Sequence, residues 1–294
     1  MRKTVKVFIT GSESFIGSVL WSRLESEGHQ VSGMDVAVKV RPGSVSIDLR
    51  DPNLHRVIPD NAKIVHLAAL STDAMCANNQ HEALGVNIGG TVNLVNAGIQ
   101  RQCSQFVFAS TEWVYGDVQN DETQCETDIL DLRKIKSYYA LTKKIGEEIL
   151  LSSRLRQTTI LRFGIVYGLR KANHSAVEKI CAMALEGNVE IGSRKTGRRF
   201  LHVNDICDGI YSAIKAEKNG VFNLTGSRII SLGEIAETCS KVLNKTVLIV
   251  DNPTVQPSIR NPNNSKAGIE LNWTPKHNLE TGLKEIINNL SQRG

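Results

Sequence analysis

The amino-acid sequence predicts an α/β protein: a doubly wound parallel sheet with helices on both faces, followed by a smaller C-terminal α/β region. Two observations predict this fold class. Short β-branched runs alternate with helix-length amphipathic segments through the first half of the 294 residues, which is the pattern of repeated β-α-β units. After about residue 164 the alternation loosens and turn residues become frequent.

Five segments of the first half are predicted strands because they are short and rich in β-branched residues. They are Val5–Thr10, Gln30–Asp35, Lys63–Ala68, Gln105–Ser110 and Thr158–Phe163. The interval after the first strand places apolar side chains from Phe15 to Leu24 at helical spacing, and Gly28 ends that helix. We expect residues 1–164 to form one doubly wound domain of the Rossmann type.

Residues 165–294 are expected to form the smaller region. Its predicted helices are 175–186, 205–216, 232–243 and 279–290, and its predicted strands are 188–191, Phe200–Val203 and Val221–Leu224. Prolines and asparagines between 253 and 264 separate the last helix from the others. We expect this region to interleave with the sheet, and the strand near 200–203 to return to it.

The charge balance favours a small anionic ligand over nucleic acid. The chain has 35 Lys and Arg against 30 Asp and Glu, a formal net charge of +5, without a basic block. A hydrophobic share of 41% is that of an ordinary folded globule. No stretch approaches the roughly 20 apolar residues of a membrane helix, so we expect neither nucleic acid nor membrane as a partner.

The cysteines indicate a reducing compartment. The six lie far apart, with no C-x-x-C pair and no His/Cys cluster at metal-ligand spacing. The apolar run after Met1 breaks at Thr10 without a small-residue cleavage site, so it is predicted as a strand rather than a signal peptide. We expect a cytoplasmic protein with reduced thiols and no metal.

A glycine turn joins the first predicted strand to the first predicted helix. The segment 10–17, TGSESFIG, can point amide groups at the helix N-terminus toward a pyrophosphate. The usual spacing in such a loop is G-x-x-G-x-x-G, and Ser14 stands at its middle glycine. An ordinary strand-to-helix turn is the alternative interpretation.

The acid at the end of the second predicted strand bears on which dinucleotide binds. The Asp35 carboxylate can accept hydrogen bonds from the ribose hydroxyls of NAD and repels the 2′-phosphate of NADP. Lys39 and Arg41 stand close by and can serve a 2′-phosphate instead. We expect NAD as the cofactor; a solvated strand-end acid is the alternative for Asp35.

Further residues follow the predicted strands at the edge where parallel sheets bind ligands. Asp48 and Leu49 come after a further short strand that follows Gln30–Asp35, and His66 lies near the end of the predicted strand Lys63–Ala68, ahead of the small residues at 67–69. Taken alone, His66 is predicted to be a packed histidine rather than an acid or base. Asp48 can simply cap a turn.

Two side chains of one predicted helix suggest acid/base chemistry. Tyr139 and Lys143 are four residues apart within 137–154, so they share a helix face. A tyrosine, with an ordinary pKa of about 10, needs adjacent positive charge to act as a base at neutral pH. Tyr138 has Thr142 at the same spacing and is the poorer candidate.

The chain resembles, nearly end to end, the extended short-chain dehydrogenase/reductases that include the NAD-dependent epimerases and dehydratases of nucleotide sugars. The segment 106–116, FVFASTEWVYG, includes the end of the predicted strand Gln105–Ser110 and precedes Y-x-x-x-K in the family's order. The same order continues in NIGGTVNL at 87–94, LRFGIVYG at 161–168, RRFLHVND at 198–205 and LNWTP at 271–275.

The resemblance implies three catalytic residues. Tyr139 would be the acid/base, Lys143 its electrostatic partner and a ribose ligand, and Thr111 the partner of the substrate hydroxyl. Residues 1–164 would bind NAD, and residues 165–294 would bind the substrate.

The remaining site residues implied by the resemblance surround the cofactor and the substrate. The cofactor would contact Gly11, Ser14, Phe15, Ile16, Gly17, Asp35, Asp48, Leu49, Leu67, Ala68, Ala69, Asn87, Tyr139, Lys143, Phe163 and Ile165. The substrate would contact Ser110, Thr111, Glu112, Trp113 and Arg198. For Arg198 the physical reason is a charge-assisted bond to a diphosphate, and a surface arginine is the alternative.

We expect an NAD-dependent epimerase that acts on a nucleotide-linked sugar through a transient keto intermediate. A dehydratase is an alternative, but Glu112-Trp113 stands where family dehydratases carry Asp-Glu, and elimination requires two positioned groups. A dehydrogenase or reductase is another. A non-catalytic NAD-sensing protein on the same fold is the alternative from a different class.

Two departures from the family pattern leave the sugar open. Gly164 stands where many relatives carry an asparagine that contacts the substrate, and Asn264 stands where an acid usually precedes Ser-Lys. The resemblance also implies a homodimer in which the segments 85–100 and 138–153 pair across a two-fold axis.

Overall fold

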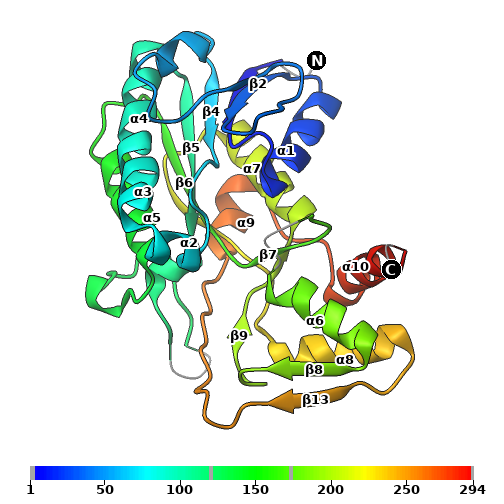
Figure 1. The fold of residues 1–294 in the computed structure, drawn as a ribbon. Coiled ribbons are helices and arrows are strands. Elements are labelled where there is room, and N and C mark those ends of the chain that lie inside the picture. Colours follow the sequence, from blue (N-terminus) through cyan, green and yellow to red (C-terminus); the bar gives the residue numbers. More distant parts are fainter. Residues whose placement is uncertain (1–3, 119–121, 172–174, 293–294) are drawn as a thin grey trace.

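A seven-stranded parallel sheet forms the centre of the computed structural model, which describes residues 4–118, 122–171 and 175–292 (Figure 1). Its strand order is β11-β6-β5-β4-β1-β2-β3. The strands are β1 Lys6–Thr10, β2 Gln30–Asp35, β3 Ser44–Ser46, β4 Lys63–His66, β5 Gln105–Thr111, β6 Thr158–Phe163 and β11 Gly220–Leu224. The predicted doubly wound sheet is confirmed.

Helices cover both faces of this sheet, as the alternating sequence pattern predicts. One face carries α1 (Phe15–Ser26), α7 (Val203–Ala216) and α9 (Ser265–Leu271), which share an apolar core with the strands (Figure 1). The other face carries α4 (Thr91–Gln100) and α5 (Tyr138–Leu151) over a second core. Among the described residues, no helix combines the length and the apolarity that crossing a bilayer requires.

Shorter helical segments lie in the connections of this half. They are η1 Leu54–Val57, α2 Asp73–Asn78, α3 Gln80–Ala83, the π-helix η2 Leu84–Gly90, η3 Glu112–Tyr115 and η4 Leu132–Lys134. Because α3 and η2 lead directly into α4, they extend this helix toward the carboxyl ends of the strands.

The smaller region has a core of its own. Three helices surround it: α6 (Ala176–Glu186), α8 (Leu232–Leu243) and α10 (Leu279–Ser291). Strand β8 pairs with β13, β9 with β12, and β7 with β10 in three two-stranded sheets. These strands are β7 Val166–Tyr167, β8 Asn188–Ile191, β9 Gly197–Arg198, β10 Leu201–His202, β12 Ile230–Ser231 and β13 Leu248–Asp251.

The expected return of the strand near 200–203 to the sheet is wrong. β10 is only two residues long, because α7 begins at Val203, and it pairs with β7 outside the main sheet. The strand that does return is β11, which follows α7 and pairs in parallel with β6 at the sheet edge. The smaller region therefore interleaves with the sheet through β11. The division at residue 164 stays a prediction.

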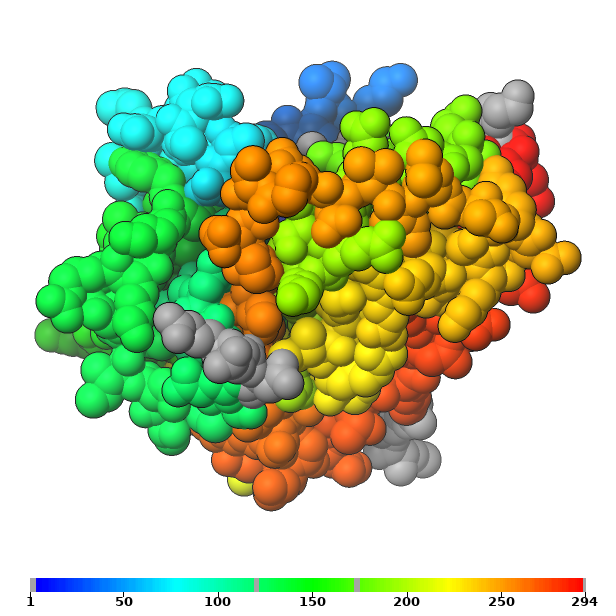
Figure 2. All heavy atoms as spheres, turned by 90° about the horizontal axis from the view of Figure 1, so that it is seen from below, coloured from blue at the N-terminus to red at the C-terminus, as the bar shows by residue number. Residues whose placement is uncertain are grey.

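A late segment of the chain lies against both halves. Ile259 forms bridges with Val118 of the first half and with Gly197 of the second, and Pro262 forms one with Gln124. Figure 2 shows this orange segment between the green residues of the first half and the yellow residues of the second. The crossing brings Arg260 to residues more than a hundred positions earlier.

Candidate active site

The glycine loop after β1 is closely packed at two of its glycines. Gly11 has a φ of +73°, and a Cβ there would lie 2.9 Å from the Ala68 nitrogen. A Cβ at Gly17 would lie 2.0 Å from the Gly11 carbonyl oxygen. Neither position has room for a side chain, so the loop backbone can approach a ligand at the N-terminus of α1.

Ser14, the departure from the usual glycine spacing, is the N-cap of α1. Its hydroxyl accepts a hydrogen bond of 3.1 Å from the Gly17 amide. A serine at this position satisfies an amide that the helix leaves unpaired. Phe15 and Ile16 are the first two residues of the helix and are half-buried. The loop thus keeps its strand-to-helix geometry without the middle glycine.

Asp35 lies at the end of β2 and is held by the glycine loop. Its carboxylate accepts hydrogen bonds from the amides of Glu13 at 2.9 Å and Ala37 at 3.1 Å. Arg41 pairs with the Glu13 carboxylate at 2.9 Å, while Lys39 is exposed. The predicted ribose ligand therefore belongs to a cluster in which the neighbouring arginine is already engaged.

The interpretation of His66 as a packed histidine is confirmed. Its side chain is 1% exposed and lies between two threonine hydroxyls, with Nδ1 2.8 Å from Thr10 Oγ1 and Nε2 3.0 Å from Thr91 Oγ1. Burial, and to a lesser degree the charge of Lys143, lowers the pKa of His66 well below its ordinary value. His66 is therefore neutral and buttresses the sheet edge.

Asp48 and Leu49 make contacts within the protein. Asp48 accepts a hydrogen bond of 2.8 Å from the Arg50 amide and pairs with its guanidinium at 2.7 Å. The Leu49 side chain is 3% exposed and belongs to the core under α4. The contacts of Asp48 thus fit the alternative that it caps a turn. The contact of Asp48 and Leu49 with the adenine of the cofactor stays a prediction.

Small or apolar residues occupy the other strand ends. Ala68 follows β4, and its amide donates a hydrogen bond of 3.2 Å to Thr10 Oγ1. The three residues Leu67, Ala68 and Ala69 are half-buried, as is Ile165, and Phe163 ends β6 with 7% exposure. The structure therefore brings these predicted cofactor neighbours to the same sheet edge.

Asn87 connects the loop after β4 to α5. Its Oδ1 accepts from the Leu70 amide at 2.8 Å, and its Nδ2 donates to the Leu70 carbonyl at 3.1 Å and to Thr142 Oγ1 at 3.0 Å. The side chain is 4% exposed. These contacts make Asn87 a positioning residue between two parts of the site; direct contact with a cofactor stays a prediction.

Tyr139 and Lys143 lie together against β5. The Lys143 Nζ is 4.8 Å from the ring centroid of Phe108 and 5.9 Å from that of Tyr139. Burial lowers the pKa of Lys143 to about 8, with nearby Cys76 acting weakly in the other direction. Burial and Cys76 both raise the pKa of Tyr139 above its ordinary value. In the protein alone, the lysine therefore loses its proton before the phenol does.

The start of α5 is held by a residue that the sequence analysis missed. Asp73 Oδ1 accepts a hydrogen bond of 2.7 Å from the Ser137 hydroxyl and one of 3.4 Å from the Tyr139 amide. Ser137 in turn caps the helix by accepting from the Ala140 amide at 3.1 Å. Asp73 thereby fixes the first turn of the helix that carries the candidate base.

A buried ion pair holds α5 to the sheet. Glu147 accepts from Arg162 on β6 through two hydrogen bonds of 2.9 and 2.7 Å. Ser110 donates to the same carboxylate at 2.5 Å. Ser110 was predicted to contact the substrate, but its hydroxyl is committed to this inward network. The substrate contact of Ser110 stays a prediction.

Thr111 and Glu112 begin η3 at the end of β5. Thr111 is 6% exposed, and its Oγ1 accepts from the Trp113 amide at 3.3 Å, which leaves the hydroxyl proton free to donate. Glu112 is fully buried, with Oε1 3.3 Å from Arg260 Nε and 3.6 Å from Arg198 Nε. Burial raises the pKa of Glu112, while the two arginines oppose this change.

Two charged atoms in this cluster have no hydrogen-bond partner among the described residues. They are Glu112 Oε2 and Arg260 Nη2, and both are buried. The Arg260 guanidinium also lies 4.2 Å from the Trp113 ring centroid. Arg198 is only 9% exposed, so the alternative of a surface arginine is wrong. A buried cluster with unpaired polar atoms is suited to an anionic or polyhydroxylated ligand.

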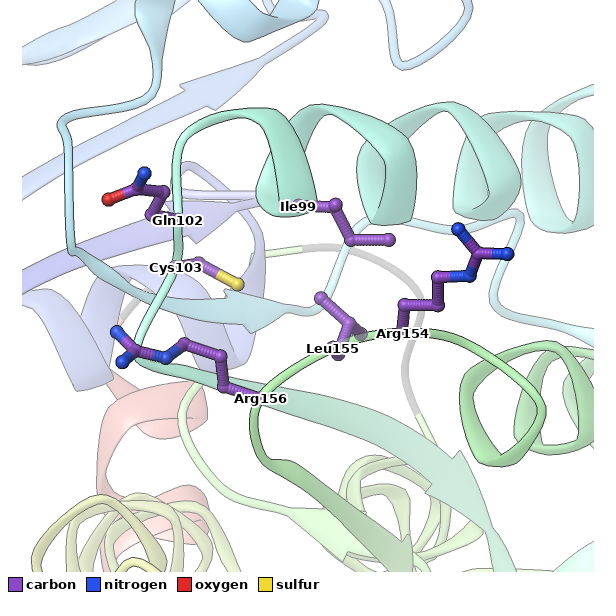
Figure 3. Close-up of a pocket in the computed structure, with 6 residues that line it drawn as sticks. All are labelled: Ile99, Gln102, Cys103, Arg154, Leu155 and Arg156. Carbon is purple, nitrogen blue, oxygen red and sulfur yellow. The ribbon is translucent and has the colours of Figure 1, made fainter.

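A separate hollow of about 310 Å³ lies at the opposite sheet edge. Figure 3 shows its lining residues between the end of α4 and the segment before β6: Ile99, Gln102, Cys103, Arg154, Leu155 and Arg156. Cys103 and Arg156 lie two residues before the first residues of β5 and β6, so this hollow is at the amino ends of the strands. The candidate residues lie at the carboxyl ends, where such sheets bind ligands.

Comparison with known proteins places the chain in a family. A sequence model of the NAD dependent epimerase/dehydratase family matches residues 7–225. The chain belongs to this family of NAD-dependent enzymes, which confirms the resemblance, the enzyme class and the cofactor expected from the sequence. The UDP-glucuronic acid decarboxylase 4 of Arabidopsis thaliana is 26% identical over 310 residues, with 99% of this chain and 70% of that protein covered.

Solved structures share the fold. The UDP-N-acetylglucosamine 4-epimerase of Methanobrevibacter ruminantium has a TM-score of 0.87 at 21% identity, with 100% of both chains covered. The UDP-glucose 4-epimerase of Thermus thermophilus, in complex with NAD, has a TM-score of 0.85 at 23% identity, with 98% of this chain and 99% of that chain covered. At these identities the likeness shows the fold alone.

Replacing Lys143 by methionine tests the cost of burying the amine. Below pH 8 the folded protein holds a charged amine in an apolar site, and the fall in pKa from 10.5 to about 8 corresponds to roughly 3 kcal/mol. We expect Lys143→Met to raise the free energy of unfolding at pH 7 by about 1–3 kcal/mol. Urea denaturation measures this change.

The pH dependence of this stability difference shows whether the buried Lys143 amine causes it. Since Lys143 binds fewer protons in the folded than in the unfolded state between pH 8 and 10.5, wild-type stability rises with pH there. The advantage of Lys143→Met should therefore shrink across that range. Lys179→Met, on the exposed face of α6, is the matched control and should show no such trend. A Lys143→Met protein no more stable than wild type at pH 7 would contradict the burial of a charged amine at Lys143.

Proposed function

We propose that the protein is an epimerase that inverts a hydroxyl-bearing carbon of a nucleotide-linked sugar. The observation that carries this proposal is the pair of half-buried Tyr139 and buried Lys143, whose amine lies over the ring of Phe108 on β5, the strand that ends at Thr111. The glycine loop follows β1, which lies two strands from β5, and so is at the same edge of the sheet. A candidate base, its charged partner and a hydroxyl donor are thus combined with a dinucleotide loop.

The glycine loop and the adjoining strand ends would hold the cofactor. Gly11 and Gly17 would adjoin the pyrophosphate and Asp35 the adenosine ribose, with the residues at 67–69 and Phe163 beside the rest. NAD supplies the acceptor and donor of hydride when it is bound. The fit rests on the two glycine positions, where any Cβ would collide with backbone.

Tyr139 would take the proton from the sugar hydroxyl and later return it. The phenol needs positive charge to release its own proton, because burial raises its pKa. Lys143, with a pKa of about 8, keeps most of its charge at neutral pH and provides it. The free hydroxyl proton of Thr111 would orient the substrate oxygen. The chain's contribution is therefore positioning and proton transfer.

The cluster of Arg198, Arg260 and Glu112 would receive the substrate. A diphosphate is bound best by guanidinium groups, which form charge-assisted hydrogen bonds. Arg260 retains a buried nitrogen without a partner among the described residues, and Glu112 retains a buried oxygen suited to a sugar hydroxyl. The named relatives, which act on UDP sugars by their names, support a nucleotide diphosphate.

An inversion is favoured over an elimination by the surroundings of Glu112. A dehydratase needs one group to remove a proton beside the new ketone and another to protonate the departing hydroxyl. Glu112 is engaged with two arginines, and Trp113 carries no group that transfers protons. The keto intermediate would therefore be reduced again on its opposite face.

The product of a nucleotide-sugar screen tests the epimerase proposal. UDP-glucose, UDP-N-acetylglucosamine and UDP-glucuronic acid are suitable probes, read by mass spectrometry and proton NMR. We expect a product with unchanged mass and one inverted ring carbon. Glu112→Gln should form the same product. Loss of water that disappears in Glu112→Gln would instead establish a dehydratase, and loss of carbon dioxide a decarboxylase.

Two adjacent tyrosines provide a matched pair of variants. We expect Tyr139→Phe to lower turnover of the active probe by a factor of about 100 or more, while NAD stays bound, because only the proton-transfer group is removed. Tyr138→Phe should reduce turnover less than about threefold, since Tyr138 does not share the helix face of Lys143. Equal losses in both variants would refute the assignment of Tyr139.

We also propose a homodimer that pairs the outer faces of α4 and α5. Apolar side chains are exposed there: Val92 at 40%, Ile99 at 38% and Leu151 at 52%. Covering such side chains favours association. Light scattering at micromolar concentration should give twice the chain mass, and Val92→Lys should shift it toward the monomer. A wild-type monomer would refute the dimer.

A further inference from the structure

We propose that Glu13 is a specificity-determining residue that makes the cofactor site selective for NAD over NADP. Its carboxylate holds Arg41 away from the position of a 2′-phosphate and adds a second negative charge beside Asp35. This inference rests on the proposed placement of the adenosine ribose at Asp35. It assigns the choice of cofactor to a pair of residues, one in the glycine loop and one after β2.

Glu13 and Asp35 are in direct contact. The Glu13 amide donates to Asp35 Oδ2 at 2.9 Å. The same loop is tied to β2 by the amides of Gly11 and Ser12, which donate to the Met34 carbonyl at 2.8 and 3.1 Å. Because these bonds fix the loop on the strand end, Glu13 is held next to Asp35.

Arg41 is bound to Glu13 through two nitrogens on one edge of its guanidinium. Nε lies 2.9 Å from Glu13 Oε1 and Nη2 lies 3.2 Å from Oε2, and the Arg41 amide adds a bond of 3.4 Å. The guanidinium also lies 5.2 Å from the Trp21 ring centroid. Such a two-pronged pair fixes the orientation of the arginine as well as its charge.

The pair persists at neutral pH. Burial alone would raise the pKa of Glu13, but the hydrogen bonds and the charge of Arg41 outweigh it and hold that pKa below its ordinary value. The two side chains are 21% and 24% exposed, so water screens their attraction only in part. Glu13 is therefore ionised whenever the protein is near neutral pH.

A 2′-phosphate would have to break this pair. NADP brings a dianionic group to the ribose and needs a cation there. Arg41 is a cation in this cluster, but turning it to the phosphate would leave the Glu13 carboxylate, bonded also to the Ser12 hydroxyl, without a cation next to Asp35 and the phosphate. The like charges would then repel one another. NAD, with only hydroxyl groups at that position, leaves the pair intact.

Calorimetric titration of the full chain with NAD and NADP tests the proposal. Wild type should prefer NAD. In Glu13→Gln the ratio of NADP to NAD affinity should rise by about tenfold, because Arg41 becomes free for the phosphate. The gain should vanish in Glu13→Gln/Arg41→Ala, as a double-mutant cycle requires. Glu234→Gln on α8, which breaks the two-pronged pair of Glu234 with Arg228, is the matched control and should leave the ratio unchanged.

The outcomes separate this inference from the proposed function. An unchanged ratio in Glu13→Gln, or a gain that survives removal of Arg41 and so points to Lys39, overturns the role of Glu13. If Glu13→Gln fails to fold, Glu13→Ala takes its place: the same rise in the ratio of NADP to NAD affinity is expected, and an unchanged ratio overturns the proposal. Failure of wild type to bind NAD refutes the cofactor site itself.

Discussion

The burial of the Lys143 amine against Phe108 and Tyr139 is the interaction on which the rest of the site depends. A charged amine taken out of water destabilises the fold unless the surrounding structure holds it. The helix that carries it can approach β5 only because Gly146 has no side chain: a Cβ there would lie 2.6 Å from Phe108 Cζ. Proton transfer by Tyr139 therefore depends on the contacts that hold α5 against the sheet.

Three of these contacts act at successive turns of α5. Asp73 holds the first turn through Ser137, Asn87 holds the next through Thr142, and the Glu147 and Arg162 pair fixes the helix to β6. The last pair is buried on both sides, so removing one partner would leave an uncompensated charge. Together they keep Tyr139 and Lys143 on the side of the helix that faces the sheet edge.

The local part of this architecture could be predicted from the sequence. β2, β6, β8 and α8 have the predicted bounds, because period and turn residues determine such elements locally. Tyr139 and Lys143 were predictable for the same reason, since four residues on a helix guarantee a shared face. The strand near 200–203 was misplaced because a two-residue strand carries no periodic signal.

The contacts between distant positions could not be predicted. Asp73 and Ser137 are 64 residues apart, and Glu112 and Arg260 are 148 apart. The serine before α5 gave an N-cap signal, but nothing in the local pattern indicates which acid reaches it. In the same way, Asp35 favours NAD and Arg41 can favour NADP, and the sequence does not show that Arg41 pairs with Glu13.

The central claim is that Tyr139 becomes a base only when positive charge is placed beside it. Ultraviolet titration of phenolate formation, taken as wild type minus Tyr139→Phe, measures this directly with and without saturating NAD. Bound NAD should lower the Tyr139 midpoint by about one pH unit or more, because it adds the positive charge of the nicotinium ring to the site. A midpoint that NAD leaves unchanged or raises would contradict the account.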